Sequence, residues 1–191
     1  MRDYFSLSVW KIIVLHIGTG GLMDKFHLFL FSFLFPLTVF AAGLEVGQSV
    51  SNLCWQDLNE KQVCLDDARG TIRVLVYNTG WCHTCNEEMA KFPAAIKPYE
   101  GKPVTFYSLS AQGFKNGDLP TTEFLKEWQK KHNIPFIVAA SPKDAGKLFW
   151  DPPYFIPRVA IIDQSGKLAN KNMETMEAVF AEINRLLGSD E

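Results

Sequence analysis

The sequence has little excess of either charge and few cysteines. Its 191 residues carry 19 Lys and Arg against 21 Asp and Glu, a formal net charge of −2. Nucleic-acid-binding proteins present strongly basic surfaces, so this balance argues against DNA or RNA as the main partner. Four cysteines are too few for the dense framework of a small disulfide-rich scaffold. They are enough for one redox pair and one further bridge.

The sequence also lacks an apolar run of the length that a membrane-spanning helix needs, which is about 20 residues. The uncharged run Phe26–Phe40 is shorter and contains Pro36. Charged residues precede it and small residues follow it, as in a secretory signal peptide. We therefore expect residues 1–41 to be an N-terminal extension with a signal peptide, translation to start at Met23, and cleavage before Ala42. The alternative is a retained membrane anchor.

Residues 42–191 have the pattern of a single domain in which strands alternate with helices. Ile72–Asn78 is nearly continuous in its apolar character, which is typical of a strand buried on both faces. This order predicts an α/β sandwich, in which ligand chemistry lies at the carboxyl ends of the strands. The other expected elements are a hairpin of 53–57 with 62–66, strands at 104–109, 135–140, 159–163 and from 168, and helices around 89–96 with a kink at Pro93, after Thr121 or Thr122, from Ser141 and over 176–187.

A Cys-x-x-Cys motif, Cys82 to Cys85, lies between the predicted buried strand and the helix that follows it. A zinc site would need two more ligands at a suitable spacing, and Cys54 and Cys64 are ten residues apart. A cysteine in the first turn of a helix faces unpaired backbone N–H groups and the positive end of the helix dipole, and both favour thiolate. Such cysteines ionise at roughly pH 3.5–7.5 instead of about 8.5. The motif therefore predicts Cys82 as the nucleophile and Cys85 as the resolving thiol.

The two residues inside the motif, His83 and Thr84, can tune the pair. A protonated imidazole at position 83 would place positive charge near the thiolate and favour an oxidant, but His83 can equally be an exposed side chain without a role. Thr84 offers a hydroxyl and little charge. These two residues therefore do not decide the direction of electron transfer.

The order of elements and several motifs resemble the thioredoxin fold, and within it the secreted TlpA-like group of ResA- and CcmG-type thiol–disulfide oxidoreductases. The resemblance covers roughly residues 47–187, and the helix and strand over 121–140 look like the insertion that distinguishes this group from thioredoxin. Its anchors are Trp81-Cys82-x-x-Cys85, Glu88, Ile156-Pro157 and Ile161-Ile162-Asp163-x-x-Gly166-Lys167.

The resemblance implies roles for residues beyond the two cysteines. Pro157 would follow a cis peptide bond and face the cysteine pair, and the backbone of Ile156 would pair with an extended substrate segment; the alternative is that Pro157 only begins a strand. Glu88 would lie near the active site and influence cysteine ionisation, or it would be a surface helix residue. The sequence departs from the family at Ala90, where proline is frequent, and at Val76, where thioredoxin has a buried aspartate.

Cys54 and Cys64 lie on the two arms of the predicted hairpin. In an oxidising compartment we expect a structural disulfide between them, which closes a short loop and contributes roughly 2–4 kcal/mol at best. The functional alternative is a second redox pair that passes electrons.

Together these features predict a periplasmic or otherwise secreted thiol–disulfide oxidoreductase that acts more as a reductant than as an oxidant. Its partners would be protein thiols and disulfides and an upstream membrane electron donor. We expect a monomer without cofactor, metal or nucleic acid, and contact with the membrane only through an uncleaved N-terminal segment. The alternative function is a Cu(I) metallochaperone that uses the same two cysteines, with Met89 as a further soft ligand.

Overall fold

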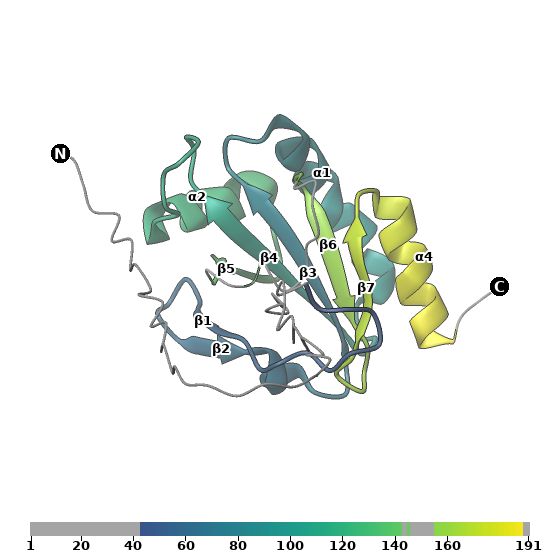
Figure 1. Ribbon diagram of the computed structural model, residues 1–191. Helices are drawn as coiled ribbons and strands as arrows, with labels where there is room; N and C mark the ends of the chain where they lie inside the picture. The colour runs from purple at the N-terminus through teal and green to yellow at the C-terminus, as the bar shows by residue number, and fades with distance from the viewer. Residues whose placement is uncertain (1–42, 143–144, 146–154, 189–191) are drawn as a thin grey trace, which may run out of the picture. The chain divides into compact units, whose positions relative to one another are not determined.

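A computed structural model of the chain describes residues 43–142, 145 and 155–188, which belong to the unit Val39–Glu191. Its centre is a five-stranded sheet with the order β5-β4-β3-β6-β7 (Figure 1). The strands are β3 (Ile72–Thr79), β4 (Val104–Gln112), β5 (Ile137–Ala140), β6 (Arg158–Ile162) and β7 (Leu168–Met173). β3 pairs in parallel with β4 and antiparallel with β6, so the strand expected to be buried on both faces is the central one.

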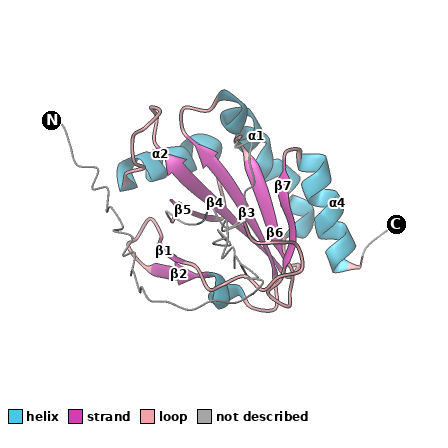
Figure 2. Ribbon diagram, in the orientation of Figure 1, coloured by secondary structure: helices cyan, strands magenta, loops and turns pink. Residues whose placement is uncertain are grey.

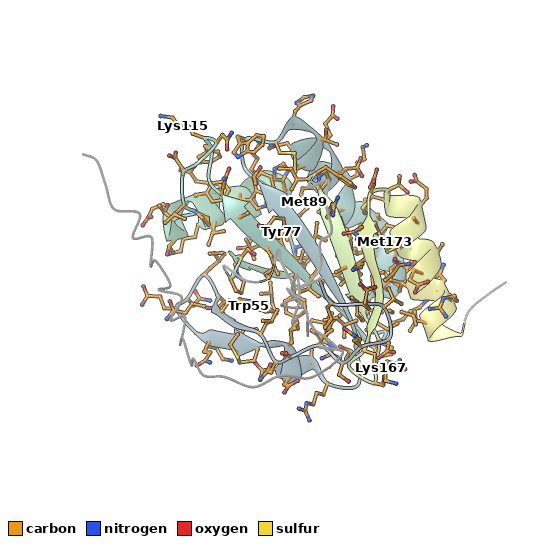
Figure 3. The ribbon with its side chains drawn as sticks, in the orientation of Figure 1. Trp55, Tyr77, Met89, Lys115, Lys167 and Met173 are labelled. Atoms are coloured by element: carbon orange, nitrogen blue, oxygen red, sulfur yellow. A yellow bond between two sulfur atoms is a disulfide. The ribbon has the colours of Figure 1, made fainter. Side chains whose placement is uncertain are left out.

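The N-terminal hairpin is confirmed as β1 (Cys54–Gln56) and β2 (Gln62–Cys64), which pair with Cys54 opposite Cys64. The 3-10 helix η1 (Leu65–Ala68) follows it. Trp55 of the hairpin packs edge-on against Tyr107 of β4, with the ring centroids 5.2 Å apart. Figure 3 shows Trp55 on the side of the sheet where the hairpin lies.

Three α-helices are described: α1 (His83–Ala95), α2 (Thr122–His132) and α4 (Met176–Leu187), and the 3-10 helix η2 (Lys97–Tyr99) follows α1 (Figure 2). Hydroxyls cap two of them, because the Thr121 side chain accepts the N–H of Phe124 and the Thr175 side chain accepts the N–H of Ala178. Thr121 is thus the cap of α2, the first of the two candidates that the sequence offered.

Apolar side chains fill both faces of the sheet, as an α/β sandwich requires. On one face, Val74 and Val76 of β3 join a cluster with residues of α1, α2 and α4. On the other face, Leu75 of β3 joins a cluster that includes Trp55 and Leu65 from the hairpin and η1. The mixed sheet with helices and a separate hairpin confirms the thioredoxin-like α/β class expected from the sequence.

Several expected boundaries are corrected. β4 continues three residues beyond Leu109, because the buried hydroxyls of Ser108 and Ser110 are both bonded to the Asn78 side chain, at 2.9 and 2.7 Å. Polar side chains that satisfy one another can therefore continue a buried strand. The helix expected around 89–96 begins earlier, at His83, and ends at Ala95, one residue before Ile96, and Pro93 lies inside it.

Some expectations fall outside the described residues. The signal peptide, the start at Met23 and the cleavage site before Ala42 are among them, as is most of the helix expected from Ser141. None of the helices in the described part of the chain is long and apolar enough to cross a membrane.

Candidate functional site

Cys82 lies where the central strand β3 leads into α1. It is the N-cap of the helix, with extended backbone angles, and its Sγ accepts the backbone N–H of Cys85 at 3.1 Å. The turn before it requires glycine at position 80, because a Cβ there would meet the Phe124 ring and the Gly113 carbonyl oxygen, the latter at 2.7 Å. The sulfur therefore occupies the place where an N-cap oxygen normally satisfies a free backbone N–H.

Cys85 lies one turn further into the helix and is fully buried, whereas Cys82 has a relative exposure of 6%. The two sulfurs are joined in a disulfide, so the structure is that of the oxidised protein. The Ile156–Pro157 peptide bond is cis. The carbonyl oxygen of Ile156 lies 3.9 Å from the Sγ of Cys82. Residues 74 positions apart thus meet at the cysteine pair, as the resemblance implies.

The remaining motif residues face outward. Trp81 is 42% exposed, and its indole N–H donates to the side-chain carbonyl of Gln112. Trp81 and Ile156 also line a hollow of about 240 Å³ beside the cysteine pair, together with Tyr77, whose pKa is raised by burial. This hollow gives an incoming chain an apolar surface next to Cys82.

His83 and Thr84 are both exposed. The side chain of His83 has a relative exposure of 87%, and its Nε2 lies 3.2 Å from the carboxylate of Glu87. A carboxylate thus faces the imidazole that could have supplied charge to the thiolate. Thr84 lines a groove between α1 and α4 together with Glu88.

Glu88 is partly exposed and accepts a hydrogen bond from Lys91 at 3.1 Å. It also lines a small cavity behind the disulfide, where Cys85 and Pro157 contribute to the wall. Met89 lines the same cavity, is 1% exposed, and belongs to the core cluster that contains Val76 of β3. The structure therefore places Glu88 on the wall of the same cavity as Cys85, and its influence on the cysteines stays a prediction.

Two features of the site were missed by reasoning from the sequence. Asn86, directly after the second cysteine, donates from its side chain to the carbonyls of Gly80 and Cys82. His132, at the end of α2, contacts the Asn86 side chain and is buried, which lowers its pKa; the charge of Lys131 lowers it further. A polar residue inside the first turn of α1 was the available signal for Asn86, and nothing local in the sequence marked His132.

The arrangement supports disulfide chemistry at Cys82 and Cys85. In the described residues no group of three or more His, Cys, Asp or Glu side chains is placed to hold a metal ion. A sulfur at a helix N-cap, with a partner sulfur behind it and an open hollow beside it, can form and break a bond to a sulfur of another molecule.

Comparison with known proteins agrees with this chemistry. The model of the AhpC/TSA family matches residues 46–171. A thiol-disulfide oxidoreductase ResA of Bacillus cereus is 25% identical over 128 residues, which are 67% of this chain and 69% of the relative. The ResA of Bacillus anthracis is 24% identical over the same shares.

Two solved structures have a similar fold. One is a thiol:disulfide interchange protein of Chlorobium tepidum TLS, with a TM-score of 0.62 and 18% identity, covering 77% of this chain and all of that one. The other is a thiol:disulfide interchange protein from Bacteroides sp., with a TM-score of 0.62 and 17% identity, covering 78% of this chain and 93% of that one. At these identities the likeness concerns the fold alone.

Proposed function

Because this chain belongs to the AhpC/TSA family and is a thiol–disulfide oxidoreductase, we propose that it exchanges disulfides with cysteines of other proteins through Cys82 and Cys85. One observation carries the assignment of the residues. The Sγ of Cys82 accepts the backbone N–H of Cys85 at the start of α1, so the helix stabilises negative charge on this sulfur when the disulfide is reduced. Cys85 is fully buried and can react only with Cys82 or with a sulfur already bound to it.

The proposed exchange has two steps. The Cys82 thiolate attacks one sulfur of a partner disulfide, which forms a bond between Cys82 and the partner and releases the second partner sulfur as a thiolate. The Cys85 sulfur, as a thiolate, then attacks the Sγ of Cys82, which forms the Cys82–Cys85 disulfide and releases the first partner sulfur. Two electrons pass to the partner, and the protein ends in the oxidised state that the structure describes.

The backbone around Pro157 supports a place for the partner chain. The Ile156 carbonyl lies 3.9 Å from the Cys82 sulfur, and Trp81 and Ile156 line the adjacent hollow. An extended segment that carries the partner cysteine would pair with the Ile156 backbone and place its flanking side chains against Trp81.

We assign the protein to the reducing direction. A strong oxidant is one whose thiolate form is unusually stabilised, and His83 is the motif side chain that could add such stabilisation. Its imidazole is exposed and lies 3.2 Å from the Glu87 carboxylate, so the ring is paired with an acidic side chain and not with the Cys82 sulfur. This arrangement supports a potential closer to that of thioredoxin, about −270 mV, than to that of DsbA, about −120 mV. A membrane electron donor would return the pair to the dithiol state.

An exported location is part of the proposal. The half-buried bond between Cys54 and Cys64 supports it, because such bridges persist in oxidising compartments such as the periplasm. In this proposal the signal peptide is removed before Ala42. Cell fractionation tests the location, and the mass of the mature N-terminus tests the cleavage site. A protein that is found in the cytoplasm and still carries residues 1–41 would contradict both statements.

Turnover of a disulfide substrate tests the function directly. We expect the reduced protein to reduce insulin or glutathione disulfide, and Cys82→Ser to abolish this activity. In Cys85→Ser the first step proceeds without the second, so a mixed disulfide between Cys82 and the substrate accumulates and is released by dithiothreitol. Absence of turnover in the intact protein, together with tight Cu(I) binding, would overturn the proposal in favour of a metallochaperone.

A further inference from the structure

Four polar contacts meet at the side chain of Asn86, the residue directly after Cys85. Its Nδ2 donates to the carbonyl oxygens of Gly80 at 3.0 Å and of Cys82 at 2.8 Å. Its Oδ1 accepts from the Nζ of Lys131 at 2.7 Å and contacts the Nε2 of His132 at 3.2 Å. The amide therefore joins the turn before Cys82 to the C-terminal end of α2.

The orientation of this amide follows from its neighbours. Backbone carbonyls only accept hydrogen bonds, so the amide NH₂ faces Gly80 and Cys82. An ammonium group only donates, so the amide oxygen faces Lys131. The neighbouring Nε2 of His132 then donates its hydrogen to the same oxygen, which fixes the tautomer of the neutral ring.

These contacts bear on Cys82 through its backbone. The Cys82 carbonyl also accepts the backbone N–H of Asn86 at 3.1 Å, so two hydrogen bonds from one residue hold it. The Cys82 sulfur accepts the Cys85 N–H only while Cys82 keeps its extended N-cap conformation. A turn that is free to move would take the sulfur away from the N–H that stabilises its thiolate.

We propose that Asn86 is a positioning residue for the exchange reaction, and that Lys131 and His132 hold its amide in the required orientation. The proposal rests on the proposed function, because it takes Cys82 as the nucleophile. The proposal also gives α2 an indirect role in the reaction, because its last turn holds the turn before Cys82 in place through the Asn86 side-chain amide.

The anchoring of α2 allows this role to be separated from folding. Phe124, Leu125 and Trp128 hold the helix in the core, and the His132 ring packs edge-on against Trp128 with centroids 4.3 Å apart. Lys131 is exposed apart from its contact with Asn86. Removal of the Lys131 ammonium therefore leaves the packing of α2 intact.

The test is the pH profile of iodoacetamide alkylation at Cys82 in the reduced full chain, followed by peptide mass mapping. In Asn86→Ala we expect the midpoint to move upward by about one pH unit, toward the roughly 8.5 of an unperturbed cysteine, which means about tenfold less thiolate near neutral pH. Lys131→Ala should move it in the same direction by less, and Lys131→Arg should restore it, because the guanidinium still donates to the amide oxygen.

Lys130→Ala is the matched control, because it removes the same charge from the same turn of α2 at an exposed position without a described contact to Asn86. An unchanged profile in Lys130→Ala beside a shifted one in Lys131→Ala supports the proposal. Equal shifts of the midpoint in both variants would mean that only the loss of one positive charge matters, and this would overturn the proposal. If Asn86→Ala does not fold, as judged by circular dichroism, the three lysine variants still decide.

Failure of the inference differs from failure of the function. A wild-type Cys82 that reacts readily at neutral pH, with the same profile in folded Asn86→Ala, overturns the role of Asn86 and leaves the proposed function standing. A wild-type Cys82 that ionises like a free cysteine also overturns the role of Asn86, whereas only absence of disulfide turnover in the wild type overturns the proposed function.

Discussion

The two cysteine pairs of this protein lie in opposite kinds of backbone. Cys54 and Cys64 are direct partners across an antiparallel hairpin, ten residues apart. Cys82 and Cys85 lie in a single turn at the start of a helix, three residues apart, with a backbone N–H directed at the first sulfur. The first pair joins two strands. The second pair, when reduced, places a thiolate at a helix N-terminus that stabilises negative charge.

Exposure alone would rank the hairpin pair as the more reactive one, which is the opposite of the proposed assignment. The hairpin cysteines are half-buried, whereas Cys82 and Cys85 are 6% and 0% exposed. The difference that favours reactivity at Cys82 is the hydrogen-bond donor on its sulfur together with the hollow beside Trp81 and Ile156. A reactive cysteine in this fold is therefore recognised by what stabilises its thiolate rather than by how much of it meets solvent.

The largest expected effect is a crossed result between the two pairs. Cys82→Ser should abolish disulfide turnover and lose about 1 kcal/mol less unfolding free energy than removal of the hairpin bridge, because the entropy of loop closure grows only slowly with loop length. The double variant Cys54→Ser/Cys64→Ser should keep turnover close to that of the wild type and lose roughly 2–4 kcal/mol of unfolding free energy. Insulin reduction and urea unfolding measure the two quantities.

Single substitutions at Cys54 or Cys64 are a poor substitute for the double variant, because each would leave the other hairpin cysteine as a half-buried free thiol that can form wrong disulfides. Loss of turnover in the folded hairpin double variant would remove the distinction between the pairs. It would favour the second interpretation of the hairpin pair, in which it passes electrons to or from Cys82.

The next effect is a difference in reduction potential. In a dithiothreitol titration followed by peptide mapping, we expect the Cys82–Cys85 pair to be reduced first. The hairpin pair should need a more negative potential, below about −300 mV, as structural disulfides of secreted proteins do. Reduction of both pairs at one potential would contradict the assignment of Cys54–Cys64 as structural.

The sequence predicted those parts of the fold whose signals are local. The hairpin, the central strand and the closing helix Met176–Leu187 follow from apolar patterning and turn residues, and the structure confirms them, with the strand predicted as Ile72–Asn78 extending to Thr79. The family resemblance supplied what no local pattern contains, namely that the backbone of Ile156, 74 residues away and next to Pro157, approaches Cys82.

Contacts that depend on tertiary packing could not be predicted in this way. Ser110 continues β4 because its hydroxyl reaches Asn78 on the neighbouring strand, and His132 reaches Asn86 across two helices. In both cases a polar residue is buried with a partner more than 30 residues away. A single sequence shows the polar residue but not its partner. Such a residue is therefore interpreted as the end of a strand or as a surface position.

A smaller effect is expected from the turn that carries Cys82. Gly80→Ala places a Cβ against the Phe124 ring and the Gly113 carbonyl, neither of which can move away easily. We expect a loss of about 1–3 kcal/mol in unfolding free energy, as for other overpacked sites, together with slower turnover. Gly113→Ala is the control, since the nearest atom to a Cβ there lies at 3.6 Å. Equal stability of the two variants would show that the turn at residue 80 can shift to accommodate a Cβ, contrary to this expectation.

The smallest effect concerns pH and again separates the two regions, since residues 54–64 contain no histidine. Burial lowers the pKa of His132 below 6.5, and the neighbouring Lys131 lowers it further. The unfolded chain then binds a proton at a higher pH than the folded one, so stability falls as the pH drops below 6.5 toward the folded pKa and is unaffected above it. His132→Gln, whose amide can still donate to Asn86, should flatten this fall between about pH 7 and pH 5 in urea unfolding of the oxidised protein. If His132→Gln and the wild type lose stability in parallel over this range, the proton is taken up elsewhere, and the network behind Cys82 is not the pH-sensitive part of the fold.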